Sequence, residues 1–111
     1  MKDQTAAQKG VPFHLESHVN YATGSVVSKT LIKKDTGTIT LFAFDAGQGL
    51  SEHKAPFDAV VTILDGQAEI TIGGTPSTVK TGEMLIMPAN ITHALQAHER
   101  FKMLLVMIRG Q

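Results

Sequence analysis

Residues 57–74 read FDAVVTILDGQAEITIGG, and this stretch decides the fold class. In QAEITI, residues 67–72, alanine and isoleucine alternate with polar side chains, which is the two-residue period of a strand with one buried face. The run before it is rich in β-branched residues, which favour strands. Asp65-Gly66 and Gly73-Gly74 follow the two runs, and both pairs readily adopt the positive φ of tight hairpin turns. The stretch therefore predicts two strands, each followed by a hairpin.

The same pattern continues on both sides of this stretch. No segment between Ser25 and Met87 keeps a helical period over the length of a helix. About eight short runs separated by turn residues indicate an all-β sandwich or barrel. The expected strands are residues 25–34, 38–44, 57–64, 67–72, 77–80, 83–87, 92–97 and 101–109.

The length of 111 residues fits one domain. We expect this β-domain to occupy residues 25–111 and residues 1–24 to form an N-terminal tail or edge segment. Residues 1–10 are polar and end in glycine, which is typical of a loose tail. Residues 11–21 have a mixed pattern that fits either a short helical turn or an edge segment.

Composition excludes several classes of function. Ten basic and ten acidic residues cancel, so no net field attracts nucleic acid or an anionic membrane. The absence of cysteine excludes disulfides, thiolate metal sites and a cysteine nucleophile. The N-terminus lacks the apolar stretch of a secretion signal, and no window approaches a membrane span. We therefore expect a cytoplasmic protein with neither a nucleic-acid nor a membrane partner.

The segment GEMLIMPANITH, residues 82–93, carries a spaced motif. Gly82 is followed after five residues by Pro88, and His93 comes five positions later. This spacing resembles the second signature of the cupins, with Asn90 at a position where that family prefers glycine. Pro88 lacks an N–H, so we expect it to end a strand just before the segment that carries the histidine.

A second motif precedes it in the order found in cupins. Gly47, His53 and Gly66 are spaced as in the first cupin signature, and the resemblance extends from Val26 to Ile108. It implies a double-stranded β-helix, which is a jelly-roll barrel of two antiparallel sheets. It does not select one function, because cupins include isomerases, dioxygenases, binding proteins and storage proteins.

The resemblance also implies an interior site, and it does so residue by residue. Cupins hold a metal with two histidines and a glutamate from the first signature and one histidine from the second. His53 and His93 match the first and last of these ligands, whereas the second histidine falls on Ala55 and the glutamate on Ala59. We expect these four residues to line one ligand pocket. Only the two imidazoles could then ligate a metal, which leaves iron, manganese, nickel, zinc or no ion at all.

Other donors have weaker support. Asp58 is next to the position of the family glutamate, but strand alternation aims it at the opposite face unless a bulge intervenes. Gln48, Glu52 and His98 are near the motifs in sequence only. We assign no catalytic residue on this basis.

Three functions remain compatible with this pattern. The first is a cupin that binds a small molecule around His53 and His93, as a metal-dependent enzyme of dioxygenase or isomerase type. The second is a metal-free binding or sensor protein, which the two alanines favour because they enlarge the pocket and remove ligands. The third is a metal-free enzyme with one histidine as general base.

The C-terminal run FKMLLVMIR, residues 101–109, has almost no polar face. A strand of this kind is covered on both sides, either by a second chain or by a central position in its own sheet. Because small cupins commonly pair through their sheets, we expect a homodimer. Four methionines could line a ligand cavity, although core filling is their more frequent use: Met84, Met87, Met103 and Met107.

Overall fold

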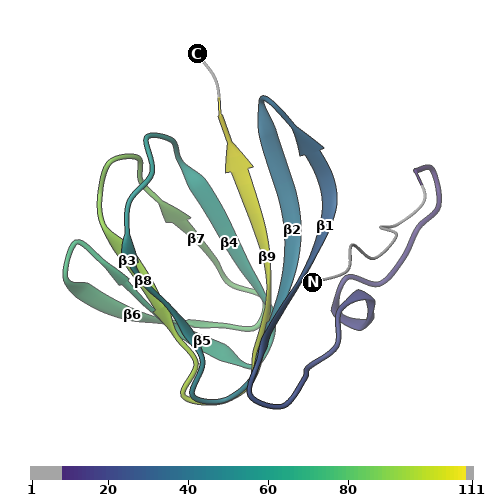
Figure 1. The fold of residues 1–111 in the computed structure, drawn as a ribbon, viewed down its shortest axis with the longest axis horizontal. Coiled ribbons are helices and arrows are strands. Elements are labelled where there is room, and N and C mark those ends of the chain that lie inside the picture. Colours follow the sequence, from purple (N-terminus) through teal and green to yellow (C-terminus); the bar gives the residue numbers. More distant parts are fainter. Residues whose placement is uncertain (1–8, 110–111) are drawn as a thin grey trace.

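The computed structural model describes residues 9–109 (Figure 1). The loose tail expected for residues 1–10 therefore lies mostly outside the described residues. No helix among residues 9–109 is long and apolar enough to cross a membrane. The elements are the 3₁₀ turn η1 Glu16–His18 and the strands β1 Val26–Lys34, β2 Gly37–Phe44, β3 Gly49–His53, β4 Ala59–Asp65, β5 Gln67–Ile72, β6 Thr75–Lys80, β7 Met84–Met87, β8 His93–Gln96 and β9 Phe101–Ile108.

The strands form two sheets that face each other. The five-stranded sheet has the order β1-β2-β9-β4-β7, and the four-stranded sheet has the order β3-β8-β5-β6. Every strand pair is antiparallel. The two sheets converge at the bottom of Figure 1 and spread toward the end of β9. This arrangement confirms the predicted all-β jelly roll.

One of the two predicted hairpins is wrong. β4 pairs with β7 and β9, whereas β5 pairs with β6 and β8, so Asp65-Gly66 does not join neighbouring strands. The pair instead carries the chain from one sheet to the other. Gly66 has φ of 75°, and a Cβ at this position would lie 2.3 Å from the Arg100 carbonyl oxygen. Gly73-Gly74, in contrast, does close the β5–β6 hairpin, where Ile72 pairs with Thr75.

β3 is absent from the strands expected from sequence. Its residues GLSEH include a single large apolar side chain, Leu50, so no alternation marks the segment. β3 lies at the edge of the four-stranded sheet and pairs only with β8. Gly49 pairs with Gln96 within this ladder. Backbone pairing and not apolar patterning therefore defines this strand.

The main core lies between the sheets. Phe44 and Phe101 stack at 4.5 Å between ring centroids and are fully buried. In β5 the inward positions predicted from alternation are confirmed, since Ala68 and Ile70 are 1% and 0% exposed. Stacked and interdigitated side chains of this kind hold the closed end of the barrel together.

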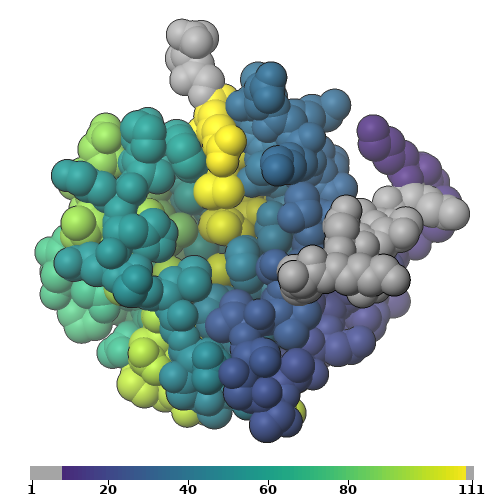
Figure 2. Space-filling view, viewed as in Figure 1, coloured from purple at the N-terminus to yellow at the C-terminus, as the bar shows by residue number. Residues whose placement is uncertain are grey.

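A smaller core lies on the outer face of the five-stranded sheet. Val19 is 3% exposed and belongs to a cluster with Leu41 and Ala43 of β2. Lys102 of β9 donates a hydrogen bond of 2.6 Å to the backbone carbonyl of Glu16. The purple and dark blue N-terminal residues accordingly lie on the side of β1 and β2 in Figure 2. Part of the apolar outer face of β9 is thus covered by the chain's own N-terminal segment.

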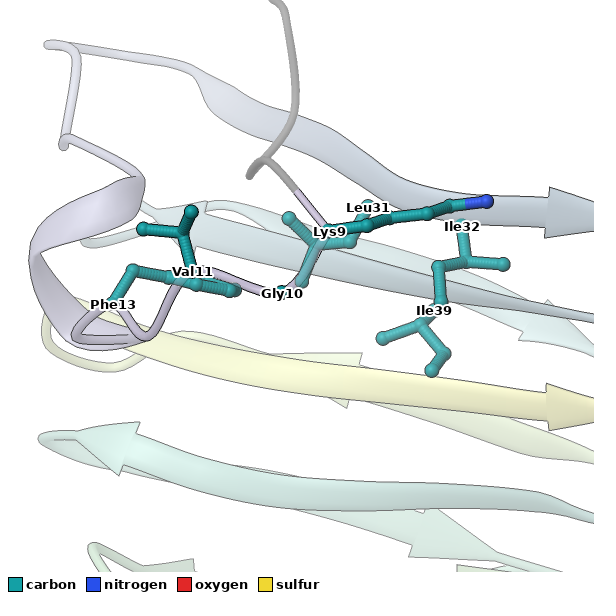
Figure 3. A pocket seen from close by; sticks show the side chains of 7 residues that line it. All are labelled: Lys9, Gly10, Val11, Phe13, Leu31, Ile32 and Ile39. Atoms are coloured by element: carbon teal, nitrogen blue, oxygen red, sulfur yellow. The ribbon is translucent and has the colours of Figure 1, made fainter.

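A shallow groove separates the start of this segment from the sheet (Figure 3). It has a volume of about 290 Å³ and lies between residues 9–13 and the outward side chains of β1 and β2, among them Ile32 and Ile39. Its walls are mostly aliphatic, and it is distinct from the space between the two sheets.

Candidate functional site

A cavity of about 240 Å³ lies between the two sheets. It receives side chains from β3 and β8 on one side and from β4, β7 and β9 on the other. Both imidazoles predicted to share a pocket line it, and all its other walls are apolar. The lining residues are Leu50, His53, Ala55, Phe57, Ala59, Met87, His93, Leu95, Met103, Leu105 and Met107.

The two histidines are in direct contact. His53 ends β3, His93 begins β8, and the two are partners in the β3–β8 ladder. Their Nε2 atoms are 3.1 Å apart, and their rings meet edge to face with 4.3 Å between centroids. The register of β3 shifts between Leu50 and His53, which brings the imidazole of His53 to the position opposite His93. Residues separated by 40 positions in sequence thus form one pair.

Hydrogen bonding indicates where the protons reside. Nδ1 of His53 lies 2.8 Å from the carbonyl oxygen of Ser51. Because a carbonyl only accepts, this Nδ1 carries a proton, and Nε2 is the ring nitrogen of His53 that faces His93. Nε2 of His93 faces Nε2 of His53 in the 3.1 Å contact. Nδ1 of His93 is buried, and a backbone hydrogen bond with Ile91 favours the protonated form of this ring.

The two rings differ in environment. His93 is 6% exposed, whereas His53 is at the accessible end of an edge strand. Burial lowers the pKa of His93, because it disfavours the charged form, and the nearby His53 lowers it further. His93 therefore stays neutral at neutral pH. The buried ring of His93 therefore presents an uncharged polar edge to the cavity.

The family's metal-ligand positions are filled by residues without donor atoms. Ala55 and Ala59 both line the cavity beside the histidines. Ala59 is flanked across the sheet by Met87 of β7 and Met107 of β9. Among residues 9–109 no three His, Cys, Asp or Glu side chains lie close enough together to hold a metal ion. Two imidazoles are fewer protein ligands than a catalytic divalent ion normally takes, so this donor set does not fit the iron, manganese, nickel or zinc expected from the resemblance.

None of the other donors considered from sequence reaches the cavity. Asp58 is exposed, and its Oδ1 accepts a hydrogen bond of 2.8 Å from a backbone N–H in the β7–β8 loop. His98 is exposed and pairs with a glutamate of β5 at 2.8 Å. Gln48 and Glu52 are absent from the cavity lining as well. The absence of these groups leaves the cavity without a carboxylate.

Two loops meet at the open end of the site. Asn90 donates its backbone N–H to the Ala55 carbonyl at 2.7 Å, which joins the β7–β8 loop to the β3–β4 loop. Asn90 has φ of 63°, a left-handed conformation that asparagine tolerates better than most residues. β7 ends at Met87, directly before Pro88, as predicted. This turn places His93 at the start of the next strand.

Sequence reasoning missed part of the cavity wall. Three of the four methionines considered do line the cavity, but Met84 is 62% exposed on the outer face of β7. Leu50, Leu95 and Leu105 were not identified, although strand alternation from the histidines would have predicted Leu95 and, from Met103, Leu105.

Comparison with known proteins now settles the family. A family model described as a cupin domain matches residues 40–108. The chain is a cupin. No curated protein matches this cupin. The family predicted from the two spaced motifs is thereby confirmed.

Solved structures agree with this assignment. A conserved protein of unknown function from Streptococcus pyogenes is 38% identical, with a TM-score of 0.91 over 100% of this chain and 97% of that one. A cupin 2 conserved barrel domain protein from Leptotrichia buccalis is 44% identical over 87% of this cupin and 47% of that chain, with a TM-score of 0.85. A cupin superfamily protein from Desulfitobacterium hafniense is 29% identical, with a TM-score of 0.88 over 99% and 100% of the two chains.

Proposed function

We propose that this cupin binds a compact, largely apolar small molecule in its interior cavity, with a polar end of that molecule on His53 and His93. The observation that carries the proposal is the composition of the cavity wall, in which the two imidazoles are the only polar side chains among the eleven lining residues. A polar group of the ligand would replace the contact that each ring now makes with the other. Apolar walls with a few convergent polar groups are typical of small-molecule sites.

The size of the cavity limits the ligand. Its volume of about 240 Å³ is below the range of about 300–1,000 Å³ that is typical of sites for drug-sized ligands. The absence of a carboxylate or an ammonium group from the wall disfavours a strongly charged or highly hydroxylated ligand, because its polar groups would be buried without partners. Compact phenols and imidazoles with an apolar body match both constraints.

The cavity wall favours ligand binding over divalent-metal catalysis. Both positions where cupins carry further ligands are alanines that open into the cavity, so they enlarge the space beside the histidines. Of the functions compatible with the sequence, the metal-free binding or sensor protein therefore has the strongest support. Ligand uptake would be governed by the fit to the apolar walls.

A substitution that reduces the volume of the cavity tests this proposal. Ala59→Leu adds a branched side chain at a 4% exposed position of the wall, and Val60→Leu is the matched control on the opposite face of the same strand. Ligand-observed NMR with compact phenols and imidazoles should give hits that bind the wild type and Val60→Leu but not Ala59→Leu. Hits that bind all three proteins equally, or no hit at all, would contradict the proposal.

We further propose that the homodimer expected from sequence forms through the outer face of the five-stranded sheet. An aliphatic row crosses all five strands there, because the register pairs each member with the next: Ile32, Ile39, Val106, Val60 and Ile86. Both ends of the row are open to solvent, at 38% exposed for Ile32 and 61% for Ile86. Light scattering should give the mass of two chains for the wild type and of one chain for Ile86→Lys. The cytoplasmic location stays a prediction.

A further inference from the structure

A positively charged side chain stands at the open end of the cavity. Met103, Leu105 and Met107 of β9 line the cavity at alternate positions, and Arg109 continues this spacing one step beyond the strand. The Arg109 backbone N–H donates to the Thr36 carbonyl at 2.7 Å, which fixes the chain beside the β1–β2 turn. The two sheets spread toward this end of β9 (Figure 1). The side chain of Arg109 therefore starts at the rim of the cavity, on the inner side of the five-stranded sheet.

The Arg109 guanidinium lies over an aromatic ring of the cavity wall. Its Cζ atom is 5.3 Å from the centroid of the Phe57 ring, and Phe57 lines the cavity from the loop between β3 and β4. Stacking on an aromatic face orients the plane of a guanidinium and leaves the N–H donors at its edge available. Arg109 is exposed, so these donors are open to solvent at the rim.

The other two cations that lie over an aromatic ring in residues 9–109 have acceptors of their own. Arg100 and Lys102 share one tyrosine ring. Arg100 donates to Asp45 at 2.8 Å, and Lys102 donates to the backbone carbonyl of Glu16 at 2.6 Å. The Arg109 side chain has neither a hydrogen-bond acceptor nor an acidic partner within the same residues. Its donors are thus available to a ligand.

A carboxylate is the group that best matches these donors. It accepts two parallel N–H bonds from one guanidinium, and the opposite charges attract each other. One guanidinium balances a single negative charge, so a monocarboxylate is matched better than a phosphate group, which carries nearly two charges. The carboxylate would remain at the rim in contact with solvent, so the apolar wall would not have to desolvate it.

We infer that the ligand of this cupin carries one carboxylate, which Arg109 binds at the mouth of the cavity while the apolar body lies inside. The inference deepens the proposed function, on which it rests for the cavity that holds the body and for the contact with His53 and His93. It narrows the proposed phenols and imidazoles to those with one acidic substituent.

Matched pairs of ligands test the inference. The acids are the ortho, meta and para isomers of hydroxyphenylacetate, which place the carboxylate at different distances from the hydroxyl, and each is compared with its neutral amide. Dissociation constants are measured by ligand-observed NMR titration of the full chain. Arg109→Gln removes the positive charge, and Lys80→Gln is the control because it removes the same charge from β6 of the other sheet. Circular dichroism checks that each variant is folded.

At least one acid should bind the wild type about fivefold or more tightly than its amide, a modest preference because solvent screens an exposed guanidinium. Arg109→Gln should lose this preference, because its affinity for the acid falls and its affinity for the amide stays the same. Lys80→Gln should keep the preference in full. Equal affinities of the wild type for acid and amide, or a preference that persists in Arg109→Gln, would overturn the inference.

Ala59→Leu distinguishes failure of this inference from failure of the proposed function. The bodies of acid and amide both fill the cavity, so both ligands should lose binding in this variant. An acid that still binds Ala59→Leu is held on the surface of the protein, and this result would also overturn the inference. If the amides bind the wild type and the carboxylate adds no affinity, only the role of Arg109 is refuted. If neither acids nor amides bind, the proposed function itself fails.

Discussion

Restoring the two missing cupin ligands should turn the cavity into a divalent-metal site. The change is Ala55→His together with Ala59→Glu, which would place three imidazoles and a carboxylate around the space that His53 and His93 already share. Such a set provides the three or more protein ligands that a zinc site requires. We expect the double variant to bind one Zn²⁺ per chain and the wild type to bind none stoichiometrically.

The size of the expected stability changes follows from the burial of Ala59. This residue is 4% exposed, so a glutamate there loses its hydration and has no positive partner until an ion arrives. An uncompensated buried charge costs about 3 kcal/mol or more, which lowers the melting temperature of the metal-free double variant by roughly 12 °C or more. Zinc at 100 times its Kd returns about 2.7 kcal/mol of unfolding free energy, which corresponds to a rise of roughly 10 °C.

The assay is thermal unfolding with zinc and with a chelator, together with elemental analysis of the purified protein. Val60→Glu is the control, because it adds a carboxylate on the opposite face of the same strand, where it cannot join the histidines, and it should gain no stability from zinc. If zinc leaves the double variant unchanged in stability and absent from the elemental analysis, then the alanine side chains do not converge on the histidines and the geometry of the site is wrong.

Three further changes test other parts of the structure. Tyr21→Phe removes the hydroxyl that donates to Asp65 Oδ2 at 2.5 Å, so the free energy of unfolding in urea should fall by about 1–2 kcal/mol. An unchanged free energy of unfolding would show that this hydrogen bond does not stabilise the fold. Asn90→Val forces a β-branched residue into φ of 63° and should cost about 1–2 kcal/mol in the same assay, whereas Asn90→Gly should be tolerated. Burial lowers the pKa of His93, so the unfolded chain takes up a proton near the ordinary pKa of about 6.5 and the folded chain does so only at lower pH. The stability that is present above pH 6.5 is therefore lost as the pH falls toward the pKa of His93 in the folded chain. The midpoint of urea unfolding should depend less on pH in His93→Gln than in the wild type. Equal pH dependence in the two proteins would count against a lowered pKa of His93.

Local patterns in the sequence predicted the fold well where one face of a strand is buried. The alternation in β5 and the spaced motifs around His53 and His93 were sufficient for the jelly roll. The hairpin predicted at Asp65-Gly66 was wrong because a positive φ identifies a turn but not the strands that pair with each other. The partners of β4 are distant in sequence. Strand β3 was missed because it is an edge strand whose side chains are mostly exposed.

The site was predictable in its polar members and less so in its walls. The family spacing selected His53, His93, Ala55 and Ala59, and all four line the cavity between the sheets, but it carries no information on the 3.1 Å contact between the rings. That contact depends on the register shift in β3, which is a property of backbone pairing. The role of the methionines likewise depends on which face of each strand is inward, as the exposed Met84 demonstrates.

The position of β3 at the edge of its sheet gives the two imidazoles unequal freedom. β8 lies between β3 and β5 and is held on both sides, so His93 is a fixed point, whereas His53 is on a five-residue strand bonded along one side only. Edge strands of this kind open locally at a lower free energy than the core does. The His93 side of the cavity is thus held more firmly than the His53 side. Local opening of β3 away from β8 would widen the cavity for larger ligands, while the stacked phenylalanines at the closed end stay in place.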